Sequence, residues 1–236
     1  MAQTLEGRVE QPWISETSIW RIMKEQLGLS HKKLSLIASQ QMTAENEARR
    51  EAYLAEALQV PAEEILVADE TAFSYNNGLR RYGWAPAHGE TRAVDIRPKV
   101  FCPNHSCIGV LSTEGFEHVS IKKGAVDGED WWEFICQCEP IFASGKFKLF
   151  VADNASVHKR MEELVRHLLQ EYGIKLLYLP AYSPDLSPIE EAFSKVKVVA
   201  QDGREDVRRD MESHIVRGFG SVTPDDARGY FRLYTR

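Results

Sequence analysis

The sequence has no uninterrupted apolar run of about 18 residues, the minimum that a helix needs to cross a bilayer. Its first residues also lack the positively charged and apolar segments of a secretory signal. Cysteine is scarce, with four among 236 residues. A membrane span and a disulfide framework are therefore not expected. The composition favours a soluble intracellular protein with one hydrophobic core.

The four cysteines leave one metal site to consider. Cys102, His105 and Cys107 form one group, and Cys136 and Cys138 form another. Paired zinc ligands are usually separated by about two to four residues, but within His105/Cys107 and Cys136/Cys138 only one residue intervenes. We favour core thiols on a strand and a helix. The alternative is a zinc module, which predicts stoichiometric zinc.

An excess of basic charge is also missing. The net charge is −6, which argues against a strongly basic nucleic-acid binder. The acidic residues of a metal site would lower this sum, so the local balance is more informative. Residues 78–100 contain five Arg or Lys residues against two acidic residues. This segment is either a solvated loop or a patch that follows a phosphate backbone.

Hydrophobic spacing predicts helices first and an alternation of strands and helices afterwards. Ser15 is a candidate N-cap of a helix that Gly28 ends, and Ser30 is a candidate N-cap of the next. A third helix is expected over 44–58. Further along, the expected strands are 65–70, 106–112, 118–122, 148–153 and 175–179, and the expected helices are 131–142, 157–172, 189–200 and a short one capped by Thr223. This order favours an α/β fold with a mixed sheet and helices on both faces, in which the first three strands form a meander and the last two are parallel.

Three carboxylates stand where this sheet would present them together. Asp69 and Asp153 each end an apolar run that is expected to be a strand, and Glu190 opens a helix. Carboxylate oxygens are the ligands that Mg²⁺ and Mn²⁺ prefer, and a pair of such ions can activate water and relieve charge at a phosphodiester. If the two strands are neighbours, Asp69 and Asp153 could share a metal pair and Glu190 could complete the site. This arrangement predicts a nuclease.

Each acid also has an interpretation without chemistry. Asp69 could be a turn former after a strand. Asp153 and Asn154 could form an Asx turn that caps the helix at His158, and a glutamate in a first helical turn is favoured by the helix dipole. The placement of the three together, rather than any one of them, indicates a site.

Two long motifs resemble the DDE transposases of the Tc1/mariner and IS630 superfamily. One is Asp153-Asn154-Ala155-Ser156-Val157-His158, and the other runs from Tyr182-Ser183-Pro184-Asp185-Leu186-Ser187-Pro188 to Ile189-Glu190-Glu191. Asp69-Glu70-Thr71 is also similar, as is the run from Arg80-Arg81 to Trp84. The chain departs from the family pattern at Ser187, where Asn is usual, and in 95–107, where prolines interrupt an expected strand.

The resemblance implies an RNase H-like fold and metal-dependent cutting and joining of transposon ends. Asp69, Asp153 and Glu190 would be the catalytic metal ligands, with Glu191 as the fallback third acid. Two Mg²⁺ or Mn²⁺ ions would serve both water attack and the attack of the freed 3′ hydroxyl on target DNA. Asn154 and His158 would support the site or cap a helix. Arg80, Arg81 and Trp84 would contact DNA.

The resemblance also implies an organisation and partners. Residues 1–60 would be a partial helix-turn-helix and linker, 61–205 the catalytic domain, and 206–236 a helical tail. The chain is expected to be truncated at its N-terminus, because only the end of a DNA-binding region is present. Arg21 and Lys24 would lie on its recognition helix, whereas Trp20 and Ile22 could equally be core. A homodimer on transposon terminal repeats and target DNA is expected, in the nucleus, or in the cytoplasm or nucleoid of a bacterium, without membrane association.

Two other functions remain open at the level of sequence. A domesticated or decayed descendant would bind DNA or a partner without catalysis. A plain RNase H-like nuclease would hydrolyse phosphodiesters without strand transfer. Mg²⁺-dependent nicking separates the first from the enzyme, and strand transfer separates the second.

Overall fold

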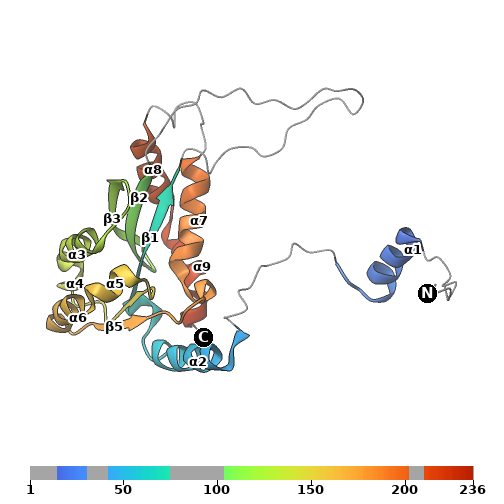
Figure 1. Cartoon of the computed structure of the whole chain (residues 1–236), viewed down its shortest axis with the longest axis horizontal. Helices are drawn as coiled ribbons and strands as arrows, with labels where there is room; N and C mark the ends of the chain where they lie inside the picture. The colour runs from blue at the N-terminus through green and yellow to red at the C-terminus, as the bar shows by residue number, and fades with distance from the viewer. Residues whose placement is uncertain (1–14, 31–41, 75–103, 202–209, 236) are drawn as a thin grey trace, which may run out of the picture. The chain divides into compact units, whose positions relative to one another are not determined.

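The computed structural model describes residues 15–30, 42–74, 104–201 and 210–235. The chain divides into two compact units, Met1–Ile37 and Ala38–Arg236. In the parts of the chain so described, no helix combines the length and the apolar character needed to cross a membrane. The second unit carries the sheet, and its elements are coloured along the chain in Figure 1.

The first unit contains one described helical segment. Helix α1 (Glu16–Arg21) continues into a π-helical turn, η1 (Ile22–Gln26). The Ser15 side chain accepts the backbone N–H of Ser18, which confirms the predicted N-cap, and Gly28 takes a φ of 63° after the helix. Trp20 is 54% exposed, so it is not a core residue of this segment. The second helix, predicted after Ser30, lies outside the described residues.

The second unit is built on a mixed five-stranded sheet of order β3-β2-β1-β4-β5. The strands are β1 (Ile65–Phe73), β2 (His105–Ser112), β3 (Gly115–Lys123), β4 (Leu149–Ala152) and β5 (Lys175–Tyr178). The pairs β1–β2 and β2–β3 are antiparallel, whereas β1–β4 and β4–β5 are parallel. The predicted meander and the predicted parallel pair are both confirmed.

Both faces of this sheet are covered, as the alternation of β1 requires. Ile65 and Val67 join an apolar cluster with α2 (Ala44–Ala57), α7 (Pro188–Ala200) and α8 (Met211–Gly220). Leu66 and Ala68 point the other way and join a second cluster. That cluster includes α3 (Gly128–Gln137), α4 (Glu139–Phe142) and α6 (Glu162–Glu171). Figure 1 shows α7 and α3 on opposite sides of the strands. The predicted helix–sheet–helix layering is confirmed.

Strand β1 is longer than the sequence suggested. It was expected to end near Glu70, but it runs to Phe73 because β2 continues beside it, with Thr71 paired to Cys107 and Phe73 to His105. The neighbour on its other side, β4, ends at Ala152. Asp69 therefore lies inside a strand rather than in a turn after one, and the turn-former interpretation of Asp69 is wrong.

Two predicted helices are divided, and one helix was missed. The expected helix over 131–142 is α3 and α4, which meet at Cys138 just before Pro140, a residue without a backbone N–H to donate. The expected helix over 157–172 is α5 (Ser156–Arg160) and α6, with a break at Met161. Helix α8 lies in the expected helical tail of 206–236, where no separate helix was predicted from the hydrophobic spacing, and it buries Ile215 and Phe219. Helix α9 (Pro224–Tyr230) has the expected cap at Thr223 and leads into η6 (Phe231–Thr235).

The compact unit includes α2 and the C-terminal helices as well as the sheet. Tyr53 of α2 and Phe231 of η6 are buried in the same cluster as Val67 of β1. The functional division into 1–60, 61–205 and 206–236 stays a prediction, but residues 44–57 and 211–235 pack as parts of the sheet-bearing unit.

Helices α7 and α8 approach so closely that Gly218 has no room for a side chain. A Cβ on Gly218 would lie 2.7 Å from the carbonyl oxygen of Val196 and 3.0 Å from its Cγ1. Gly218→Ala is therefore expected to lower the free energy of unfolding by about 1–3 kcal/mol, measured by urea titration. Gly220→Ala on the same helix is the matched control, because a Cβ there meets nothing within 4 Å. Equal stability of the two variants would contradict this packing.

Candidate active site

The sheet register brings Asp69 and Asp153 to the same level. Ala68 of β1 pairs with Ala152 of β4 in the parallel ladder, and the two aspartates are the next residues on each strand. Asp153 leaves the sheet as β4 ends, whereas Asp69 stays within β1. The two strands are thus parallel neighbours, which is the condition that a metal site shared by Asp69 and Asp153 requires.

The third acid reaches the same place from helix α7. Ser187 is the N-cap and Pro188 the first helical residue, so Glu190 lies in the first turn. Ile189 beside it is fully buried in the cluster that contains Val67, which seats the start of α7 against the sheet. The structure thus brings Glu190 and the two aspartates into one cleft of about 350 Å³. The other lining residues are Asn154, Ala155, Leu179, Pro180, Ala181, Tyr182, Ser183, Pro184 and Ser187.

The electrostatics of this cleft favour a bound cation. Burial raises the pKa of Asp69 to about 7, and the charges of Asp153, Glu70 and Glu190 add to the increase, against a hydrogen bond from the Glu70 N–H. Several carboxylates that oppose one another's ionisation form an all-oxygen donor set, and a divalent ion would relieve their repulsion. The residues present therefore fit Mg²⁺ or Mn²⁺.

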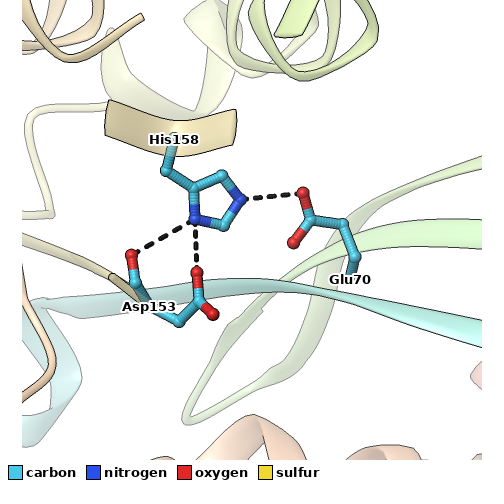
Figure 2. Close-up of side chains that lie close together, drawn as sticks. All are labelled: Glu70, Asp153 and His158. Carbon is cyan, nitrogen blue, oxygen red and sulfur yellow. Dashed lines mark hydrogen bonds and ion pairs between the residues drawn. The ribbon is translucent and has the colours of Figure 1, made fainter. Parts of the chain in front are cut away.

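Asp153 is held by a buried histidine (Figure 2). His158 of α5 has no exposed side-chain surface. Its Nδ1 lies 2.5 Å from Oδ1 of Asp153, and its Nε2 lies 2.7 Å from Oε1 of Glu70. The ring also packs on Trp131, with centroids 3.9 Å apart. Among the residues that the structure describes, these three are the one group of possible metal-ligand side chains with donor atoms within 4.8 Å of one another.

The charges in this trio support one another. Burial disfavours the cationic ring, but hydrogen bonds to Asp153 and Glu70 outweigh it and raise the pKa of His158 to about 10. Burial would raise the pKa of Asp153, yet the His158 hydrogen bond and charge hold it below its usual value. Asp153 and the His158 imidazolium are therefore both charged at neutral pH, and the buried cation lies between two carboxyl groups.

The same contacts leave one oxygen of Asp153 available. Oδ1 accepts from His158 and, at 3.0 Å, from the backbone N–H of Ala155, whereas Figure 2 shows the other oxygen directed away from the imidazole. The Ala155 bond is the Asx turn that the sequence allowed, so the turn and the site coexist at Asp153. Asn154 is exposed and lines the cleft.

The remaining predicted residues fall elsewhere. Arg80, Arg81 and Trp84 lie outside the described residues. Arg21 and Lys24 are exposed in the first unit, where Lys24 Nζ lies 4.6 Å from the centroid of Trp20.

The fallback acid and the zinc alternative are both disfavoured. Glu191 forms a bidentate pair with Arg232, at 2.6 and 3.0 Å, and does not line the cleft. Cys107 and Cys138 are buried in the clusters on opposite faces of the sheet, so these two thiols are core residues and cannot share one zinc ion.

Two residues of the site were not identified from the sequence. Glu70 follows Asp69 in the short motif but was given no role, because only the fold reveals its contact with His158. Tyr182 lines the cleft, is 54% exposed and has a φ of 56°. Bulky residues rarely adopt this left-handed conformation, and such strain often accompanies a functional site. Nothing in the local sequence signals it.

The sheet order and the layering match an RNase H-like fold, and carboxylates from β1, from the end of β4 and from α7 converge on one cleft of it. A sequence model of the DDE superfamily endonucleases matches residues 64–210. Because this match covers more than half of the chain and includes all three acids, the chain belongs to the DDE endonuclease superfamily. It is therefore an enzyme by family.

Solved structures agree with this assignment. The Mos1 mariner paired end complex with Mn has a TM-score of 0.69 and 18% identity, over 94% of this chain and 68% of that one. The Mos1 strand transfer complex has a TM-score of 0.68 and 18% identity, over 94% and 67%. The Mos1 catalytic domain with raltegravir and Mg has a TM-score of 0.57 and 16% identity, over 85% and 92%. These likenesses confirm the fold expected from the Tc1/mariner resemblance. No curated protein matches the sequence.

Proposed function

We propose that the chain is a DDE transposase that cuts transposon ends by metal-dependent phosphodiester hydrolysis and joins them to target DNA. The observation that carries the proposal is the convergence of Asp69, Asp153 and Glu190 on one open cleft, where their charges oppose one another. The likeness to Mos1 structures described as paired end and strand transfer complexes supports the same reaction class.

Each side chain has a role in this proposal. Asp69, Asp153 and Glu190 would hold two Mg²⁺ or Mn²⁺ ions, which when bound would activate the nucleophile and stabilise charge on the phosphate. His158 holds Oδ1 of Asp153, and the other oxygen, which points away from the imidazole, would bind the ions. Tyr182, exposed at the rim, would stack against a base or sugar of the DNA end.

DNA and a second copy of the chain are the proposed partners. Arg21 and Lys24 are exposed on a helical segment and would contact the phosphate backbone or the groove. The Mos1 complexes hold paired ends, which supports a form that binds two DNA ends. We propose a homodimer for that form.

Nicking of a supercoiled plasmid tests the hydrolytic step. The wild type should nick it in Mg²⁺ about a hundredfold faster than in EDTA, and Asp153→Asn should remain at the EDTA level. In a second assay, a duplex with a free 3′ hydroxyl should become joined to the plasmid.

Three other outcomes of these measurements would identify a different function or a different metal site. Hydrolysis without joining would identify a plain RNase H-like nuclease. DNA binding with wild-type nicking no greater than that of Asp153→Asn would identify a non-catalytic descendant. Stoichiometric zinc in the purified protein that is lost when the cysteines are replaced would support the zinc module as the alternative.

A further inference from the structure

The start of helix α7, which carries Glu190, is not fixed by a cap of its own. Ser187 is the N-cap residue, but its side chain makes no capping bond, and its Oγ is buried without a hydrogen-bond partner. Pro188 at the first helical position has no N–H to donate. Besides the packing of Ile189, the position of Glu190 therefore depends on the turn before it, a 3-10 turn named η5 (Pro184–Leu186).

One support of this turn comes from α2, far away in the sequence. Arg50 donates from Nη1 to Oδ1 of Asp185 at 3.0 Å and from Nη2 to Oδ2 at 2.6 Å. This is a bidentate pair, the geometry that best fixes a carboxylate in both distance and orientation. The hydrogen bond with Asp185, more than its charge, raises the pKa of Arg50 against the effect of burial.

The other support comes from the C-terminal end of the unit. The hydroxyl of Tyr234, in η6, donates to the backbone carbonyl of Leu186 at 2.8 Å. The hydroxyl of Tyr234 also lies 2.5 Å from the hydroxyl of Tyr53. Because Tyr234 has already donated its single proton to Leu186, Tyr53 is the donor in this second hydrogen bond. Both rings are 4% exposed. Tyr53 lies on α2 three residues after Arg50, so one face of α2 reaches both supports.

The first and last described elements of this unit thus converge on one turn. The contact between the hydroxyls of Tyr53 and Tyr234 places η6 beside α2. Apolar packing in the shared cluster would hold α2 and η6 in the fold without these bonds. The hydrogen bonds fix the orientation of the turn, because they end on Asp185 and on the carbonyl of Leu186, five and four residues before Glu190.

We propose that Arg50 and Tyr234 are positioning residues that clamp η5 and so place Glu190 for metal binding in the cleft. This inference rests on the proposed function, in which Glu190 is a metal ligand. Partners beyond the direct ligands commonly set metal affinity about 10- to 100-fold. If the turn is loosened, all three acids remain, but Glu190 must become ordered when the ion binds, and this ordering weakens the affinity for the ion.

Mn²⁺ affinity, measured by calorimetry on the full chain without DNA, tests the clamp independently of activity. Arg50→Gln and Tyr234→Phe are each expected to weaken Mn²⁺ binding about tenfold. Plasmid nicking by both variants should recover to near the wild-type rate at saturating Mn²⁺. The matched controls are Arg49→Gln, on the exposed side of α2 in a pair with Glu45, and Tyr230→Phe. Both should bind Mn²⁺ as the wild type does.

A pair of substitutions that exchanges the charges of residues 50 and 185 distinguishes a positioning role from a loss of structure. Arg50→Glu should weaken Mn²⁺ binding, and adding Asp185→Arg should restore part of it by re-forming the ion pair. Thermal unfolding without metal reports stability for every variant. The clamp would be overturned if Mn²⁺ affinity simply followed the melting temperature in clamp and control variants alike. It would also be overturned if Arg50→Gln and Tyr234→Phe bound Mn²⁺ as tightly as the wild type. A wild type that binds no Mn²⁺ and does not nick DNA would instead overturn the proposed function.

Discussion

Replacing Asp69 with asparagine is expected to abolish metal-dependent cleavage and, at the same time, to stabilise the metal-free protein. Cleavage should fall by roughly a thousandfold, because a lost ligand removes several kcal/mol of charge stabilisation from the transition state. Stability should change in the opposite direction, because in the absence of metal Asp69 is a destabilised carboxylate. Plasmid nicking in Mg²⁺ measures the first effect, and urea unfolding in EDTA measures the second.

The sign of the stability effect follows from the pKa of Asp69. It is about 7 in the fold against 3.8 in its ordinary state, so between these values the folded protein holds a proton that the unfolded chain has released. Stability of the metal-free wild type therefore decreases as pH rises from about 4 to 7. Asparagine cannot ionise and escapes this loss. At about pH 8, Asp69→Asn should be more stable by on the order of 2 kcal/mol, and near pH 4 the two proteins should be alike.

Asp225→Asn is the control for this experiment. Asp225 is an exposed residue of α9 that pairs with Arg228, and its replacement should change stability by less than about 0.5 kcal/mol at either pH. It should also leave nicking unchanged. If Asp69→Asn proved less stable than the wild type at about pH 8, Asp69 would be a structural residue with satisfied hydrogen bonds rather than one of several opposed carboxylates.

Much of the sheet was predictable because its signals are local. The apolar run Ile65–Ala68 and its counterpart Leu149–Ala152 are buried on both faces, and each is followed by an acid. The connection through a helix required β4 and β5 to be parallel. The parallel pairing of β1 with β4, which brings Asp69 and Asp153 to the same level, was a condition of the predicted site rather than a consequence of the local sequence.

The supports of the site were not predictable, because they join residues far apart in the sequence. Glu70 and His158 are 88 residues apart, and Arg50 and Asp185 are 135 apart. Helix α8 was missed for a related reason. Its charged surroundings outweighed Ile215 and Phe219, whose burial depends on the narrow gap that Gly218 allows against α7. Local patterns thus indicated the acids, whereas the contacts that hold them depend on the tertiary fold.

The second large effect is expected at His158. His158→Ala should lower the free energy of unfolding by on the order of 3 kcal/mol, because it leaves Glu70 and Asp153 without the cation between them and opens a gap beside Trp131. Mg²⁺-dependent nicking at limiting metal should also fall about 10- to 100-fold, because the Asp153 carboxylate would no longer be fixed. Urea unfolding and nicking across a range of Mg²⁺ concentrations measure the two effects.

The pH dependence of this effect has a definite direction. The pKa of His158 is about 10 in the fold against 6.5 in its ordinary state, so its stabilising contribution is complete below about pH 6.5 and is lost as pH rises toward 10. The stability difference between the wild type and His158→Ala should therefore be largest near pH 6 and should shrink as the solution becomes alkaline. A difference that stayed constant from pH 6 to 10 would mean that packing on Trp131, rather than charge, accounts for the loss.

A double variant separates the charge from the cavity. If the loss in His158→Ala arises from unpaired carboxylates, adding Glu70→Gln removes one of those charges and should recover on the order of 1 kcal/mol. In the wild-type background, Glu70→Gln should destabilise, because it removes a partner of the imidazolium. The same substitution is thus expected to have opposite signs in the two backgrounds, as a double-mutant cycle by urea unfolding would reveal. An effect of the same sign and size in both backgrounds would show that Glu70 and His158 are not coupled.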